Sequence, residues 1–373
     1  MKKKLIFLQL NEINFDLLKY YFHDTKVKNF ESIISKKNYI ETTSETNLKL
    51  LEPWIQWVTI NTGKSALEHN IFRLGDVVDN GIKQIYENLE AYGFSVGAIS
   101  PMNTENRLKN PAFFIPDPWT KTLSDNSYWS LTISKTISKL VNTNANGKIK
   151  FKDLFKLAII SIRFARLKNY YLYIYFILSS RGKRWRKAII LDLLLGDIYL
   201  SYLRKHKPDF TSLFLNSCAH IQHHYLNNSR ISRNNHSIKS LSIANNNYDP
   251  FREIIVVYDR LLKDLINLDE YDLLIATGLT QVPNEKNDFY YRPKNHSKLI
   301  DKFNIKYSNI VSLMSRDFII NFENNSDTIK AQKILNLIKV NDDKFLFGDI
   351  DNRGESLFVS LIYNDEIDKE TKV

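Results

Sequence analysis

The stretch KKLIFLQL, residues 3–10, is a nearly continuous apolar run that ends directly at Asn11 and Glu12. Runs of this kind are typical of strands covered on both faces. Three more stretches of strand character follow along the chain: FSVGAIS (94–100), FTSLFLNS (210–217) and YDLLIATG (271–278). Helical segments separate them, among them PWIQWVTINTG (53–63), which Gly63 is expected to end. This alternation predicts an α/β protein with a doubly wound, mostly parallel sheet.

Residues 125–205 interrupt the alternation. They contain long helical candidates and few turn signals, which predicts an inserted helical subdomain or cap. We therefore expect the first part of the α/β core over residues 1–124 and the second part over residues 206–373. The Pro-punctuated FFIPDPW segment (113–119) is expected to be a loop, and KFLFGDIDNRGESLFVSLIY (344–363) is expected to form a hairpin.

The composition indicates a globular protein of a reducing compartment. Of its 373 residues, 43% are hydrophobic and 25% are charged, which is ordinary for a folded domain. Cys218 is the only cysteine, so no internal disulfide can form, and we expect a cytoplasmic protein. The start MKKKLIFLQLNE has the basic head of a signal peptide, but its apolar run is short and no small-residue cleavage site follows. No stretch offers the roughly 18 uninterrupted apolar residues of a membrane span.

The net charge of +11 is concentrated in one segment, residues 148–187. This segment holds 12 Lys and Arg residues and one acid, Asp153, so the rest of the chain has 40 basic and 40 acidic residues. Its cations alternate with aromatic and aliphatic residues. Such a segment can make peripheral contact with the inner membrane through anionic lipid, or steer an anionic substrate. Alternatively, it forms a cap helix pair with an apolar core face and solvated cations. We find no nucleic-acid motif and expect no nucleic-acid partner.

Three of the eight histidines are crowded into NSCAHIQHHYLNN, residues 216–228. His220 and His224 are spaced i, i+4 and would share a helix face, with His223 beside them. The cluster follows a predicted strand, as Asn11 and Glu12 do, and carboxyl ends of parallel strands are where α/β proteins bind ligands. A mixed set of nitrogen and oxygen ligands predicts a divalent metal, with Zn²⁺ or Mn²⁺ favoured over Mg²⁺. The alternative is a cluster of hydrogen-bonded or solvated histidines that binds no metal.

The run LEPWIQWVTINTGKSALEHNIFRLGD, residues 51–76, supplies further candidates. Glu52 and Thr59 would face the histidines if this helix begins at the carboxyl edge of the sheet, and Gln56 shares a helix face with Thr59. We predict catalytic roles for these three residues. Trp54 and Trp57 are spaced i, i+3 and are candidate substrate contacts, as is Gln281 of the TGLTQ cluster that follows YDLLIA. In the alternative interpretation the tryptophans are core residues and Glu52 is a capping charge.

The order of these pieces resembles the alkaline phosphatase superfamily, especially its phosphodiesterase and nucleotide-pyrophosphatase-like branch. The likeness rests on Pro53 with Thr62-Gly63 and EHNIF, on the spacing His220-x-x-x-His224-Tyr225, on Thr277-Gly278-Leu279-Thr280, and on YYRPKNHSKLI, and it covers roughly residues 3–305 without the insert. A bacterial subgroup associated with surface-polysaccharide genes is closest in its motifs. The resemblance implies that the sheet is of the alkaline-phosphatase-like type and that His296 is a further metal ligand. Arg292 and Arg316 are candidates to clamp a phosphate bidentately, and the alternative for either is a surface salt bridge.

The chain also departs from the pattern of that family. Leu51 occupies the position of the family's nucleophile, and Asn11 that of its first metal-binding aspartate. We therefore expect a metal-dependent hydrolase or transferase acting on a phosphoester or related anionic ester, in surface-glycan metabolism, with Thr59 or a metal-bound water as nucleophile. The alternative is a non-catalytic protein of the same fold that binds an anionic glycan or a partner protein.

Overall fold

The computed structural model describes residues 3–36, 39–144, 151–230, 248–282, 289–313, 316–368 and 370–371. It divides the chain into two compact units, the first made of Met1–Leu140 and Ile149–Glu285 and the second of Val141–Lys148 and Lys286–Val373. The division at residue 285 falls inside the 206–373 part that the sequence predicts as one piece of the α/β core. Positions 148–150 of the basic segment lie outside the described residues.

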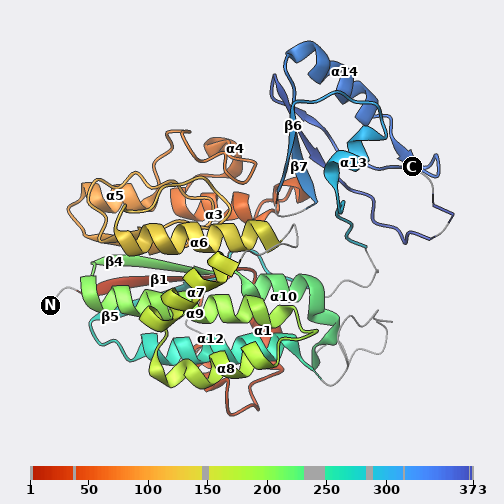
Figure 1. The fold of residues 1–373 in the computed structure, drawn as a ribbon. Coiled ribbons are helices and arrows are strands. Elements are labelled where there is room, and N and C mark those ends of the chain that lie inside the picture. The colour runs from red at the N-terminus through yellow and green to blue at the C-terminus, as the bar shows by residue number, and fades with distance from the viewer. Residues whose placement is uncertain are drawn as a thin grey trace. The chain divides into compact units, whose positions relative to one another are not determined.

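A five-stranded, all-parallel sheet forms the centre of the first unit (Figure 1), in the order β3-β2-β4-β1-β5. Its strands are β1 (Lys4–Leu10), β2 (Val96–Ile99), β3 (Phe113–Ile115), β4 (Phe210–Leu215) and β5 (Tyr271–Ala276). Leu8 of β1 is in register with Leu213 of β4 and with Ile275 of β5. The α/β class and the parallel sheet are thus confirmed, whereas the alkaline-phosphatase-like type stays a prediction.

One strand was expected to be loop. Phe113–Ile115 of the FFIPDPW segment pair in parallel with β2 at the edge of the sheet, and all three side chains are buried. Burial of these residues against the sheet outweighs the nearby prolines, which lie just beyond the strand at positions that do not have to donate ladder hydrogen bonds.

Helices cover both faces of this sheet. The described helical elements between residues 15 and 266 are α1 (Phe15–Lys19), α2 (Lys28–Ser35), η1 (Leu48–Leu50), α3 (Pro53–Thr62), α4 (Ala66–His69), α5 (Ile85–Ala91), α6 (Tyr128–Asn144), α7 (Phe151–Phe164), η2 (Leu167–Asn169), α8 (Tyr170–Leu178), α9 (Trp185–His206), α10 (Ser217–Tyr225), η3 (Leu226–Asn228) and α12 (Pro250–Ile266). Figure 1 shows α3, α5 and α6 on one side of the sheet and α9, α10 and α12 on the other. Gly63 ends α3 with a left-handed φ of 67°, as expected. No described helix is both long enough and apolar enough to cross a membrane.

The predicted insert is largely part of the core. Helix α9 packs on β4 and α12 and buries a long apolar face that includes Ile189, Leu193 and Tyr199, and α6 buries Ile133 and Ile137. Both helices are therefore layers of the doubly wound fold. Only α7, η2 and α8 remain as an addition to it.

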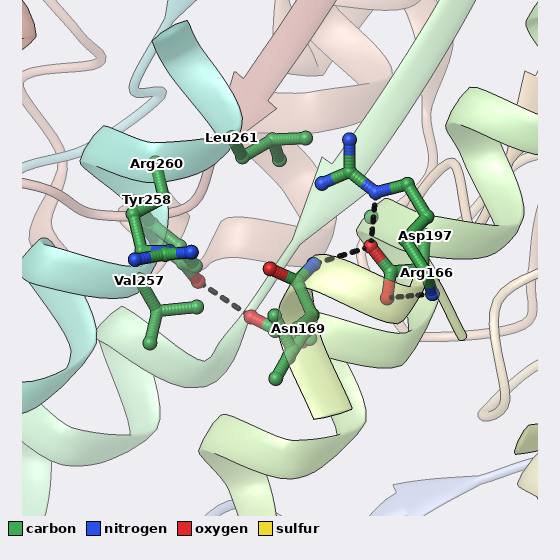
Figure 2. A pocket seen from close by; sticks show the side chains of 10 residues that line it. Arg166, Asn169, Asp197, Val257, Tyr258, Arg260 and Leu261 are labelled. Carbon is green, nitrogen blue, oxygen red and sulfur yellow. Dashed lines mark hydrogen bonds and ion pairs between the residues drawn. The ribbon is translucent and has the colours of Figure 1, made fainter. Parts of the chain in front are cut away.

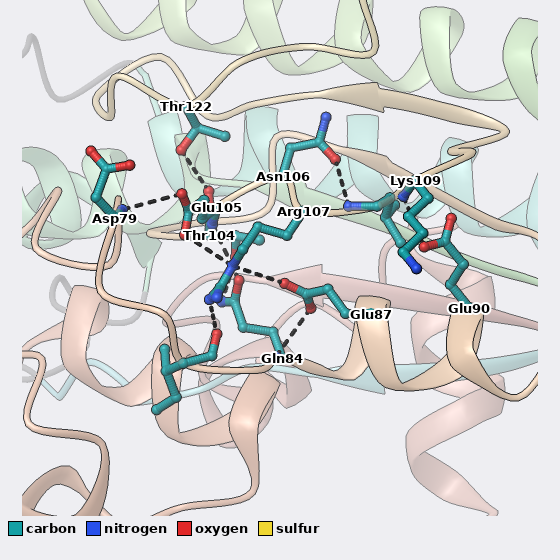
Figure 3. Close-up of polar contacts among 12 residues, drawn as sticks. Asp79, Gln84, Glu87, Glu90, Thr104, Glu105, Asn106, Arg107, Lys109 and Thr122 are labelled. Carbon is teal, nitrogen blue, oxygen red and sulfur yellow. Dashed lines mark hydrogen bonds and ion pairs between the residues drawn. The ribbon is translucent and has the colours of Figure 1, made fainter.

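A cluster around Arg107 fixes the loops that follow β2 (Figure 3). The guanidinium Nε lies 3.0 Å from Glu105 Oε2 and 3.5 Å from Glu87 Oε1. Gln84 donates to the Thr104 hydroxyl at 3.4 Å. Because one cation ties a helix to two loops, we interpret this cluster as structural.

The second unit has its own core and sheet. Its elements are α13 (His296–Asp301), β6 (Asn309–Ser312), β7 (Asp317–Asn321), α14 (Asn325–Leu335), β8 (Lys339–Val340), β9 (Lys344–Phe345), β10 (Asp351–Asn352) and β11 (Ser356–Ser360). Four strands form an antiparallel sheet in the order β10-β11-β7-β6, and β8 pairs with β9. The predicted hairpin is confirmed in β10 and β11. Phe318, Ile320 and Leu357 are fully buried in the core beneath this sheet.

Candidate functional site

Three chain segments meet at the carboxyl edge of the parallel sheet. Because β1 lies between β4 and β5, the residues that follow these three strands begin side by side. Asn11 and Glu12 follow β1, α10 follows β4, and Thr277–Gln281 follow β5. The backbone N–H of Glu12 still donates to the Thr277 carbonyl, at 2.9 Å. The structure therefore brings together the polar clusters that the sequence places at strand ends.

Glu12 is the buried carboxylate of this edge. Its side chain is 2% exposed, and its φ of 57° is in the left-handed region, which costs a residue with a Cβ about 1–2 kcal/mol. The carboxylate accepts a hydrogen bond from Gln281 Nε2, and its Oε2 lies 2.9 Å from Nε2 of His223. Backbone strain of this kind is characteristic of functional sites.

The three histidines lie on one helix, α10, as their spacing predicts. The rings of His220 and His224 are in edge contact with centroids 4.8 Å apart, while His223 reaches Glu12. All three side chains reach solvent, although surrounding protein atoms partly desolvate their rings, and the opposite face of α10 is buried. Gln222, on that buried face, donates from Nε2 to the Glu12 carbonyl at 2.9 Å. The histidine helix is thus tied directly to the end of β1.

A buried acid of α9 holds the start of the histidine helix. Asp192 accepts hydrogen bonds from the backbone N–H of Ser217, at 2.8 Å, and from the hydroxyl of Tyr258. Burial raises the pKa of Asp192 to about 6, against these two hydrogen bonds, which lower it. The first turn of α10 is therefore anchored from beneath, and the positions of the imidazoles depend on α9 and α12.

The surroundings drive the pKa values of the three imidazoles apart. The hydrogen bond from His223 to Glu12 raises the pKa of His223 against the opposing effect of burial, and the charges of Glu12 and Glu52 raise it further. Burial and the neighbouring imidazoles lower the pKa of His220 to about 4, and burial with the charge of His223 lowers the pKa of His224. Of the three rings, His223 is therefore the one whose protonated form the site favours, whereas His220 and His224 are shifted toward the neutral form.

Asn11 is committed to structural hydrogen bonds. Its Nδ2 donates to Asn216 Oδ1 at 2.7 Å, and its Oδ1 accepts from the indole Nε1 of Trp57, also at 2.7 Å. Trp57 is fully buried and packs edge-on against Phe214. A Cβ on Gly278 would come within 3.1 Å of the Trp57 ring. The prediction that Trp57 binds substrate is therefore wrong in this structure, because the core covers the whole ring.

The other candidates of α3 divide between the site and the core. Glu52 is the N-cap residue of α3. Its charge raises the pKa of His223, so it is near the histidines, as predicted. Gln56 is buried and donates to the Leu50 carbonyl at 3.0 Å. Trp54 is partly buried, with its Nε1 donating to the Phe72 carbonyl at 3.3 Å. Of these three residues, Glu52 alone is shown acting on the histidine cluster.

Thr59 contacts a different histidine. Its hydroxyl lies 3.1 Å from Nε2 of His69, and Nδ1 of the same ring accepts from the Ile71 N–H at 3.0 Å. Burial lowers the pKa of His69, and a ring whose Nδ1 accepts a hydrogen bond is the neutral form. Because Nδ1 is an acceptor, the single ring proton sits on Nε2 and is donated to Thr59. His69 therefore does not act as a base toward Thr59, and this geometry does not make Thr59 a nucleophile.

Two predicted site residues belong to the second unit. Arg292 donates from Nη2 to the Leu313 carbonyl at 2.7 Å. His296 is buried against Phe318, with ring centroids 5.0 Å apart, and burial lowers its pKa. Their predicted parts in phosphate and metal binding stay predictions.

The predicted metal ligands of the first unit do not form a metal centre as they stand. Asn11 has both amide atoms engaged, and the carboxylate of Glu12 already accepts from Gln281 and contacts His223. Among the described residues, no three His, Cys, Asp or Glu side chains are arranged to hold a metal ion. Metal binding at this edge therefore stays a prediction.

Two residues that support the site were not anticipated. Asp192 stands within the apolar helix LDLLLGD, and an acid at a core position of a helix is a signal that it has buried partners. Gln222 lies between the histidines, but the sequence gives no sign that its amide reaches the Glu12 carbonyl.

Comparison with known proteins places the chain in no family. No protein-family model matches it, and neither does any curated protein. The resemblance to the alkaline phosphatase superfamily stays a prediction, and function has to be argued from the chemistry of the site.

Proposed function

We propose that the chain is a hydrolase or transferase that cleaves a phosphoester or a related anionic ester at the carboxyl edge of its parallel sheet. The observation that supports this most is the pair formed by His223 and the strained, buried Glu12, next to two imidazoles whose pKa values are lowered. Neighbouring groups whose pKa values are pushed apart are the usual basis for assigning an acid and a base.

In the proposed reaction, His223 is the general acid. Glu12 faces its Nε2 and stabilises the imidazolium, so Nδ1 delivers a proton to the leaving oxygen as the ester bond breaks. His220 or His224 is the general base and takes a proton from the attacking group as the new bond to phosphorus or carbon forms. If water attacks, the enzyme is a hydrolase, and if a sugar hydroxyl attacks, it is a transferase. A positioned acid or base of this kind typically contributes a factor of about 10²–10⁴.

The substrate class rests on charge and on motif order. A protonated His223 is a cationic hydrogen-bond donor at the site, which favours an anionic ester. The sequence resemblance to phosphodiesterases supports the same class and suggests surface glycans. Bound Zn²⁺ or Mn²⁺ stays a prediction, which elemental analysis of the purified protein will test.

A second candidate is a non-catalytic protein that binds an anionic glycan or a protein. It is favoured by Leu51 at the position of the family's nucleophile and by Thr59, whose hydroxyl accepts a hydrogen bond from His69 and finds no base there for its own proton.

Turnover of p-nitrophenyl phosphate and bis(p-nitrophenyl) phosphate separates the two candidates. We expect measurable hydrolysis of at least one compound, lost about 100-fold or more in His223→Gln. The control is His23→Gln, because His23 is exposed and lies between α1 and α2, outside the site. Hydrolysis that survives in His223→Gln would refute the assigned acid. No hydrolysis, together with calorimetric binding of a phosphorylated oligosaccharide, would favour the second candidate.

A further inference from the structure

Helix α7 turns an apolar face to solvent. Its buried residues, Asp153, Ile160 and Phe164, lie on one stripe at intervals of seven and four. The residues on the opposite side are apolar and exposed: Phe151, Leu154, Phe155, Ile159 and Ile162. Phe151 is 84% exposed and Ile162 is 76% exposed. A helix of a globular protein normally has the reverse arrangement, with its apolar stripe toward the core.

The next elements along the chain, η2 and α8, also expose apolar side chains. Leu167 of η2 is exposed, and α8 buries Tyr173 and Phe176. Its remaining large side chains are exposed: Tyr170, Tyr171, Ile174, Tyr175, Ile177 and Leu178. This surface of α7, η2 and α8 is here called the apolar platform. An apolar area of this kind on a folded protein usually marks a binding surface.

Buried polar contacts set the orientation of the platform. The Asp197 carboxylate of α9 accepts from the Arg166 N–H and Nε, at 2.9 and 2.7 Å, and from Asn169 Nδ2 at 2.7 Å (Figure 2). Arg166 also pairs with Asp264 of α12, at 2.7 Å. Tyr173 donates its hydroxyl to Asp197 at 3.0 Å. Because these contacts join the α7–α8 connection to two core helices, the apolar side chains face outward by construction.

Cations border the platform. Residues 151–187 contain ten Lys and Arg residues and one acid, and that acid, Asp153, is paired with Lys139 at 2.9 Å. Seven of the cations are exposed: Lys152, Lys156, Arg163, Lys168, Arg181, Arg184 and Lys187. On α7, the spacing of 152, 156 and 163 puts these three residues along one border of the apolar stripe. The platform therefore combines exposed apolar groups with positive charge.

We propose that the apolar platform docks on the surface of an anionic lipid bilayer, with its apolar side chains in the interface and its cations at the headgroups. A second copy of the chain fits the platform poorly. A two-fold interface would bring the platform against itself and place the two sets of cations opposite each other. Anionic lipid supplies both the apolar phase and the opposite charge.

Vesicle co-sedimentation with the full chain tests this inference. We expect binding to vesicles of equal parts phosphatidylglycerol and phosphatidylcholine, weak binding to pure phosphatidylcholine, and loss of binding in high salt. The variant Phe155→Ser/Ile162→Ser should bind at least tenfold more weakly. Lys152→Ala/Lys156→Ala should bind roughly 25-fold more weakly, since each interfacial cation contributes about a fivefold factor. Leu337→Ser is the control, because Leu337 is an exposed leucine outside the platform.

Two results would overturn the inference. One is binding of the platform variants to anionic vesicles as tightly as the unmodified chain. The other is no binding of the unmodified chain together with a dimer in sedimentation analysis that Phe155→Ser/Ile162→Ser dissociates, which would assign the platform to a second copy. Hydrolysis of soluble p-nitrophenyl esters should be unchanged in these variants, so failure here is distinguishable from failure of the proposed function.

Discussion

Replacement of Glu12 by glutamine tests the pairing of this residue with His223. The substitution preserves the size of the side chain and one acceptor oxygen, but it removes the negative charge. The hydrogen bond to the carboxylate is the main cause of the raised pKa of His223. We therefore expect the pKa of His223 to fall in Glu12→Gln, because burial, which lowers it, remains.

The energy involved follows from the geometry of the pair. At 2.9 Å, unit charges attract by about 1.4 kcal/mol in a water-like dielectric and by about 6 kcal/mol at an effective dielectric constant of 20. Glu12 is buried, but the side chain of His223 is 51% exposed, so solvent screens the pair and the lower figure applies. About 1.4 kcal/mol corresponds to a roughly tenfold loss of rate in a step that requires protonated His223.

The assay is kcat/KM for phosphodiester hydrolysis as a function of pH, with the imidazole signals followed by NMR. An acid acts only while protonated, so the rate falls as pH rises through the pKa of His223, and in Glu12→Gln this fall should begin at lower pH. The contribution of this pair to folding stability also falls as pH rises. A raised pKa gives a contribution that is full below the ordinary value of about 6.5 and is lost as pH rises through the folded value.

Glu31→Gln is the matched control, since Glu31 pairs with Lys28 on the surface of α2. A titration of His223 that is identical in Glu12→Gln and in the unmodified protein would refute the pairing. If the pKa of His223 falls in Glu12→Gln but the pH at which kcat/KM declines does not change, His223 is not the general acid.

Three other substitutions test separate parts of the structure. Glu12→Gly should be about 1 kcal/mol more stable than Glu12→Ala in urea unfolding, because only alanine keeps the left-handed strain; the opposite order would contradict the strain. Trp57→Phe should lose about 1–2 kcal/mol with its buried bond to Asn11, and an unchanged urea midpoint would show that this bond is not needed. Burial raises the pKa of Asp192 to about 6, so its contribution to stability is lost as pH rises from about 4 through 6. In Asp192→Asn the urea midpoint should therefore change less with pH over this range. A midpoint that changes with pH as much as in the unmodified protein would exclude Asp192 as the cause of the change.

The parallel sheet was predictable because its strands are local signals. Residues 4–10, 96–99, 210–215 and 271–276 are short apolar runs bounded by polar residues, and burial on both faces leaves little alternative to a central strand. The edge strand β3 was not predicted because three residues before a proline are too few to show the two-residue alternation of a strand. The division at residue 285 was missed because antiparallel and parallel strands have similar composition.

The site was predictable in outline and not in detail. The i, i+4 spacing and the position after β4 were sufficient to group His220 with His224 and to place Glu12 near His223. No pattern reveals that Glu12 adopts a left-handed φ, or that the proton of His69 points at Thr59. Trp57 was misassigned because exposed and buried tryptophans have the same helical spacing. Its burial depends on the close approach that Gly278 permits in the bend after β5.

The orientation of α7, with its apolar stripe toward solvent, cannot be predicted from the hydropathy of its sequence. An amphipathic pattern identifies two faces of a helix without saying which one meets the core. In α7, two ion pairs determine which face meets the core. Asp153 is paired with Lys139, and Arg166 is paired with the buried Asp197. If the apolar stripe faced inward, Asp197 would lose its cation and remain a buried, unpaired charge, at a cost of about 3–5 kcal/mol. The ion pairs thus fix the rotation of the helix, and the apolar stripe remains available for a partner outside the protein.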